Sequence, residues 1–109
     1  MANIYKNAKL DLTSTGEVTV YTAPSNSRAI IKSILLHNDS GSSADISMKV
    51  VNASSTEFPI FTQFATTART TYQLLTEPLI LEESEVLKAT AGQADRLLLV
   101  VSLLEINRD

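Results

Sequence analysis

Several residue types are absent from this chain of 109 residues or rare in it. There is no cysteine, which excludes disulfides, thiol catalysis and zinc–thiolate sites. There is one histidine, His37, so a single chain cannot build a two-histidine metal site. There is no tryptophan, and three Tyr and three Phe offer little surface on which bases or sugars could stack. The fold therefore depends on packing and strand pairing.

Positive charge is also scarce. Nine Lys and Arg stand against 12 Asp and Glu, and the basic residues are scattered along the chain. A nucleic-acid binder typically carries a basic patch, so we expect no nucleic-acid partner. No apolar run reaches the roughly 18 residues that cross a membrane, and the first residues lack the apolar core of a signal peptide. We expect no membrane partner, and a protein that stays in the cytoplasm unless it leaves inside a larger particle.

The remaining sequence is typical of β-strands. The few Gly and Pro residues fall at breaks between segments that alternate or are rich in β-branched residues. These segments are 4–13, 17–22, 28–38, 44–51, 58–64, 69–75, 79–81, 86–91 and 96–106. Residues 76–87 could be helical, which leaves an α+β fold as the alternative, but Pro78 interrupts them. About eight short strands predict an all-β fold, an antiparallel, jelly-roll-like β-sandwich that forms one domain over residues 1–109.

Local patterns add detail to this prediction. Residues 1–14 are either an N-terminal arm or the first strand, and the turn at Gly16 predicts a hairpin between 4–13 and 17–22. Residues 28–38 are apolar on both faces, which favours a central strand. In residues 44–51, alternation places Ile46, Met48 and Val50 inward. Pro59 favours an edge strand or a bulge. A simple strand would point Phe61 opposite to Phe58 and Phe64 and toward a partner surface, whereas a bulge would turn all three inward.

The last strand is the most informative segment. One face carries Leu97, Leu99, Val101 and Leu103, which can fill the core. The other face is also apolar and carries Leu98, Val100, Leu104 and Ile106. Leaving such side chains in water forgoes roughly 1.5–3 kcal/mol each, so a second layer or another subunit is expected to cover them. The chain is predicted to assemble.

Motifs for catalysis or ion binding are nearly absent. His37 stands at a strand end beside Asn38 and Asp39, which favours an ordinary polar residue leading into a turn, and no Gly-x-Ser-x-Gly motif accompanies it. Glu82, Glu83 and Glu85 form an acidic turn without the spacing of a calcium loop, so a solvated loop is the simpler interpretation. Residues 39–42 invite the same interpretation. We predict no catalytic residue, no metal site and no cofactor.

Two sets of segments resemble a known group of proteins. They are Tyr21–Pro24, Arg28–Ile34 and His37–Gly41 in the first half, and Pro78–Glu82, Glu85–Ala89 and Ser102–Ile106 in the second. Together they resemble small β-sandwich virion structural proteins of tailed bacteriophages, especially marine and cyanobacterial ones. The likeness spans roughly residues 17–106. The sequence departs from the group at Glu83-Ser84-Glu85, where the usual turn glycine is missing.

The resemblance implies a non-enzymatic structural protein of the virion, assembled in the host cytoplasm. The expected role is a capsid decoration or cement protein that bridges and stabilises neighbouring capsid subunits. Its expected partners are copies of itself, with a trimer favoured, and other virion proteins such as the major capsid protein. The residues expected at partner interfaces are Ile4, Tyr5, Lys6, Phe61, Leu98, Val100 and Leu104.

Other roles remain open at this point. A small tail, neck or fibre component fits the same resemblance. A receptor-binding or carbohydrate-binding module would need exposed aromatic residues near a loop, for which Tyr72 and the turn at 82–85 are the only material. A cupin-like enzyme would need several histidines. An intracellular oligomer unrelated to phage is also compatible with the sequence, because β-folds of this kind host many functions.

Overall fold

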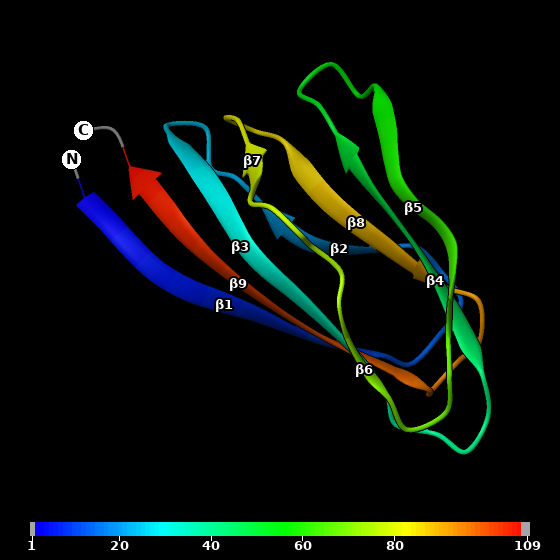
Figure 1. Ribbon diagram of the computed structural model, residues 1–109. Helices are drawn as coiled ribbons and strands as arrows, with labels where there is room; N and C mark the ends of the chain where they lie inside the picture. The colour runs from blue at the N-terminus through cyan, green and yellow to red at the C-terminus, as the bar shows by residue number, and fades with distance from the viewer. Residues whose placement is uncertain (1, 108–109) are drawn as a thin grey trace.

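The computed structural model describes residues 2–107, which form nine strands in two antiparallel sheets (Figure 1). The first sheet has the order β1 (Ala2–Leu12), β9 (Leu97–Asn107), β3 (Ser27–Asn38) and β6 (Thr71–Gln73), and β7 (Leu79–Leu81) also pairs with β3. The second sheet has the order β2 (Val18–Thr22), β8 (Val86–Ala91), β4 (Ala44–Val51) and β5 (Glu57–Thr66). The described residues include no helix able to cross a membrane.

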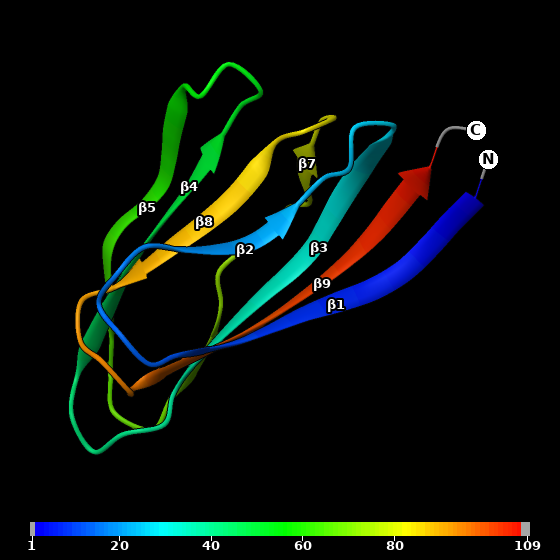
Figure 2. The ribbon, with the colours of Figure 1, turned by 180° about the vertical axis from the view of Figure 1, so that it is seen from behind.

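The connections between the sheets are those of a jelly roll. β6 and β7 pair with different stretches of β3, so they act as two halves of one edge strand. With these halves counted together, eight strands form two four-stranded sheets, and most connections cross from one sheet to the other (Figure 2). The predicted all-β, jelly-roll-like sandwich is confirmed.

One predicted pairing is wrong. Residues 4–13 and 17–22 do not form a hairpin, because β1 pairs with β9 over its whole length while β2 pairs with β8 in the other sheet. The turn around Gly16 instead carries the chain between the sheets. β9 is apolar on both faces and eleven residues long, so it offers β1 a longer partner than the five-residue β2 does. The predicted strand 69–75 is also shorter than expected and covers only Thr71–Gln73.

The core lies between the two sheets. Leu97, Leu99, Val101 and Leu103 of β9 are buried, as alternation predicted. Across from them, the second sheet contributes buried residues of β8 and β4, namely Leu87, Ala89, Ala91, Ala44, Ile46 and Met48. β3 lies between β9 and the β6–β7 edge and buries Ala29, Ile31, Ile34 and Leu36, which confirms it as a central strand.

β5 is an edge strand with two irregularities in its pairing to β4. Gln63 has a φ of 48°, which marks one bulge, and the second lies next to Pro59. As a result Phe58, Phe61 and Phe64 stand opposite Val50, Met48 and Ile46. Phe61 and Phe64 both pack against the core, which a simple strand with a spacing of three would not allow, whereas Phe58 remains 52% exposed.

Candidate functional site

The outer face of the first sheet carries an apolar row that crosses four strands. Tyr5 of β1 is paired with Leu104 of β9, Leu104 with Ile30 of β3, and Ile30 with Ile80 of β7. Directly paired residues point to the same side of a sheet, so the four side chains form one continuous stripe. Tyr5 is 75% exposed and Ile80 is 59% exposed. We call Tyr5, Leu104, Ile30 and Ile80 the outer apolar row.

A second apolar cluster lies further along the same face. Val100 of β9 is paired with Leu35 of β3, and both are more than a third exposed. Leu98 stands on the same side of β9 and is paired with His37. Ser102 and Ser33 separate this cluster from the outer apolar row. The face thus presents two apolar clusters with a polar strip between them.

The structure brings four of the seven predicted interface residues together on this face: Tyr5, Leu98, Val100 and Leu104. Ile4 and Lys6 stand on the inner side of β1, opposite Glu105 and Leu103. Ile4 is nevertheless 43% exposed, because it lies near the end of the sheet. Phe61 lies in the other sheet, where its ring meets the edge of Phe64 at a centroid distance of 6.0 Å.

Sequence reasoning missed three residues of this face: Ile30, Leu35 and Ile80. Ile30 and Leu35 had a signal, because the segment 28–38 is apolar on both sides. Ile80 had almost none, since β7 is only three residues long and its partner strand lies about fifty residues earlier in the sequence. Strand order was needed to place it in the outer apolar row.

A buried carboxylate links the two sheets. Glu105 is 5% exposed and accepts hydrogen bonds from the hydroxyl of Tyr21 and from Lys6 Nζ, the latter at 3.3 Å. The Tyr21 hydrogen bond, together with Lys6, lowers the pKa of Glu105 below its usual value. Burial, followed by the neighbouring carboxylate, raises the pKa of Tyr21. Alternation places Glu105 on the inner side after Leu103, so the sequence contained a signal for this cluster.

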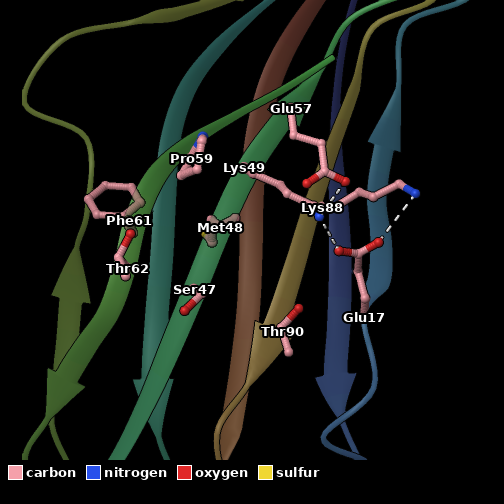
Figure 3. A pocket seen from close by; sticks show the side chains of 10 residues that line it. All are labelled: Glu17, Ser47, Met48, Lys49, Glu57, Pro59, Phe61, Thr62, Lys88 and Thr90. Carbon is pink, nitrogen blue, oxygen red and sulfur yellow. Dashed lines mark hydrogen bonds and ion pairs between the residues drawn. The ribbon is translucent and has the colours of Figure 1, made fainter. Parts of the chain in front are cut away.

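The outer face of the second sheet is charged where the first is apolar. Glu17, Lys88, Lys49 and Glu57 cross it in a row (Figure 3). Lys49 pairs with Glu17 and with Glu57, at 2.8 Å for the latter, and Lys88 lies 3.5 Å from Glu17. The two carboxylates raise the pKa of Lys49, and Lys49 lowers that of Glu17. Two positive and two negative charges balance, so this shallow pocket attracts neither anions nor cations strongly.

His37 stands between a hydroxyl and a carboxylate. Its Nδ1 lies 2.8 Å from Thr71 Oγ1, and its Nε2 lies 3.4 Å from Asp39 Oδ1. The side chains of His37 and Asp39 lie at the surface, with exposed fractions of 38% and 72%. A nucleophile there has no shielded site in which to hold a substrate.

The acidic turn at 82–85 is held by its own hydrogen bonds. Glu85 Oε1 accepts from the Glu82 amide at 2.9 Å, and Ser84, with a φ of 66°, occupies the position of the missing turn glycine. Among residues 2–107, no three His, Asp or Glu side chains gather closely enough to hold a metal ion.

Comparisons with known proteins give structural neighbours only. No family model and no curated protein matches the chain. The core of Drosophila NLP, studied for pentamer formation and histone binding, matches with a TM-score of 0.54 and 14% identity, over 92% of this chain and 96% of that one. The VP2 protein of infectious bursal disease virus, in derived T=1 particles, matches with a TM-score of 0.51 and 11% identity, over 96% of this chain and 32% of VP2. A cyanophage Pam1 capsid chain matches with a TM-score of 0.45 and 15% identity, over 97% of this chain and 85% of that one.

The fold and the surface together define a class: a small jelly-roll domain with one apolar outer face and one charge-balanced outer face. At these identities the NLP and VP2 structures establish likeness of fold alone. The chain corresponds to nearly the whole NLP core but only to about a third of VP2.

Proposed function

We propose that this chain is a non-enzymatic structural protein of a virion, and that it decorates or cements a capsid by bridging neighbouring subunits. The observation that carries the proposal is the outer face of the first sheet. There Tyr5, Ile80, Leu35 and Val100 are exposed to water in the single chain, with Ile30 and Leu104 partly exposed between them. Apolar stripes of this extent on a small domain mark surfaces that another protein covers.

The fold supports the same role. Jelly rolls are frequent in viral capsid proteins. The VP2 structure comes from virus-derived particles and the NLP core was studied for pentamer formation, so both neighbours in fold are associated with assembly. The resemblance of residues 17–106 to small phage virion proteins points in the same direction.

The physical task of such a protein is to add contact area between capsid subunits. One copy needs only a weak contact, since many identical copies on a symmetric shell act together. The outer face, with Tyr5, Leu98, Val100 and Leu104, is the surface proposed to touch partners. Ile4 and Lys6 beside it and Phe61 at the other sheet extend the proposal as secondary contacts. The partners proposed are copies of this chain and the major capsid protein.

The direct test is to look for the chain in particles. Particles purified from the biological source of the sequence by density gradient would be analysed by quantitative mass spectrometry. We expect the chain to co-purify with a major capsid protein at a fixed ratio. Expression in the cells without incorporation into particles would contradict the proposal. Separating heads from tails before the analysis distinguishes a capsid role from a tail, neck or fibre role.

Two further measurements address the remaining alternatives. Light scattering of the purified chain over a wide dilution series reports whether it forms a discrete homo-oligomer. If the chain were an enzyme, His37→Ala would abolish an assayable activity while keeping the fold, because the His37 imidazole lies between the hydroxyl of Thr71 and the carboxylate of Asp39. Such a loss would contradict the non-enzymatic role.

A further inference from the structure

β1 is a long strand with one free edge. It pairs with β9 over eleven residues without a register shift, and nothing pairs with its other side within residues 2–107. It contains no Gly and no Pro. Such an edge exposes a row of unpaired backbone N–H and C=O groups and is a template for another strand.

The other edge strands are short or irregular, and β1 differs from them in being long and regular. β5 contains Pro59 and two bulges. β2 has five residues and a bulge after Thr19. β6 and β7 have three residues each. Proteins use proline, bulges and short strands to prevent strand addition, and β1 has none of these three. β1 does carry Lys6 and Lys9, but Lys6 is already paired with Glu105 of β9.

The sequence of β1 is complementary to itself in an antiparallel pairing centred on Asn7. That register uses all eleven residues and places Ile4 opposite Leu10 of the second copy on the inner side. On the outer side it places Tyr5 opposite Lys9 and Asn3 opposite Asp11. No like charges meet, and the aromatic and apolar residues gain cross-strand neighbours.

Registers shifted by two residues also keep the outer sides of the two β1 strands together, but they give less favourable cross-strand pairs. A shift by two residues in one direction places Lys6 opposite Lys6 of the second copy, which is a repulsive pair. The same shift in the other direction places Lys6 opposite Leu10. Only the register centred on Asn7 pairs all eleven residues of β1.

We propose that two copies of this chain join through their β1 strands, antiparallel and centred on Asn7. The two first sheets then become one continuous sheet. Directly opposed residues point to the same side, so the outer faces of both copies lie on one side of the dimer, with a Tyr5 near the junction from each copy. The inner-side Ile4, 43% exposed in the single chain, gains Leu10 as a neighbour.

This pairing rests on the proposed function and adds to it, because it specifies the strand through which two copies of the assembling protein contact each other. The contact is isologous, so it produces dimers and other even-numbered assemblies, unlike the trimer expected from the sequence. The joined outer faces would offer a capsid an apolar surface twice as wide as that of one copy.

The experiment uses single-cysteine variants of the full chain, which has no cysteine of its own. In the proposed register the two copies of residue 7 lie about 5 Å apart, within reach of a disulfide. The two copies of residue 9 lie roughly 14 Å apart, out of reach. We expect Asn7→Cys to form a covalent dimer under mild oxidation, while the matched controls Lys9→Cys and Asn3→Cys on the same side of β1 stay uncross-linked. Circular dichroism checks that each variant is folded.

The outcomes separate the pairing from the proposed function. Cross-linking of Asn7→Cys at least tenfold faster than the controls supports the pairing. Equal rates at all three positions, or no cross-linking at residue 7, overturns it. A trimer that survives dilution would also overturn it while agreeing with an assembling virion protein. Cross-linking through Val100→Cys instead would mean that copies meet through the outer face, which overturns the edge pairing alone. Incorporation into particles is measured separately, so a failure of the proposed virion function is distinguished from a failure of the strand pairing.

Discussion

Tyr21 in one sheet donates a hydrogen bond to Glu105 in the other, so this side-chain pair links the two layers of the sandwich. The carboxylate is buried, and Lys6 from the neighbouring β1 supplies the opposite charge. A buried carboxylate without such partners would be strongly unfavourable. This cluster is therefore a buried polar link between the two sheets.

Replacing Tyr21 by Phe removes the hydroxyl and leaves Glu105 with Lys6. Because hydrogen bonds to charged groups are the stronger kind, we expect the free energy of unfolding to fall by about 1.5–3 kcal/mol. Urea denaturation followed by circular dichroism measures this. Tyr5→Phe, at an exposed position, is the matched control and should change stability by less than about 0.5 kcal/mol. An equal loss in the free energy of unfolding for the two variants would show that the Tyr21 hydroxyl does not stabilise the fold.

The same carboxylate predicts a pH dependence. The pKa of Glu105 is lowered from 4.5 in the folded chain, so its ionised form stabilises the fold at pH values above 4.5. This contribution is lost as the pH falls below 4.5 and through the folded pKa. We expect Glu105→Gln to show a smaller loss of stability over that range than the unmodified chain does. Glu77→Gln, at an exposed loop position, should behave like the unmodified chain; a flattened profile there too would contradict the assignment.

Val100 and Val101 are neighbours in sequence that face opposite ways. Val101 is fully buried, whereas Val100 lies on the outer face. We expect Val101→Asp to lower the free energy of unfolding by more than about 4 kcal/mol, because an unpaired charge enters the core. Val100→Asp should cost about 1 kcal/mol or less in the single chain and weaken its assembly. Thermal unfolding and light scattering together measure both. A folded Val100→Asp protein that assembles as well as the unmodified chain would remove Val100 from the interface.

Ser84 adopts a φ of 66°, a conformation that costs little only for glycine. Replacing it by Gly should raise the free energy of unfolding by about 0.5–1 kcal/mol. Ser25→Gly, in a loop without a positive φ, is the control and should bring no gain, because glycine there only adds freedom to the unfolded chain. Urea denaturation of the two variants tests this. A gain at both positions would mean that the backbone at Ser84 is not the cause.

Lys49 and Lys88 are directly paired across β4 and β8, and Glu17 forms an ion pair with each of them. Glu17→Gln leaves two like charges opposite each other, with only Glu57 nearby. We expect a lower melting temperature at low ionic strength and a smaller difference in concentrated salt, which screens the repulsion. Thr19→Ser in the adjacent β2 serves as a control without a charge change. A difference that is independent of salt would contradict an electrostatic origin.

The sequence by itself determined the class of fold and which residues of β9 face inward and outward. Period-two alternation marked the inward residues of β4 and β9, because a strand can bury only every second side chain. The apolar second face of β9 identified Leu98, Val100 and Leu104 as outward residues. Pro59 placed β5 at an edge, because proline cannot donate a hydrogen bond to a neighbouring strand.

Only the tertiary structure decided which strands meet. Local turn signals favoured a hairpin between residues 4–13 and 17–22, but β1 pairs with β9, which lies at the other end of the chain. A short window of sequence does not predict long-range pairing, because that pairing depends on the total buried surface of both sheets. The same strand order brought Ile80 into line with Tyr5 and left β1 with a free edge. Glu105 is the single charged residue of the largely apolar β9, and only the tertiary structure places its partners Tyr21 and Lys6 beside it.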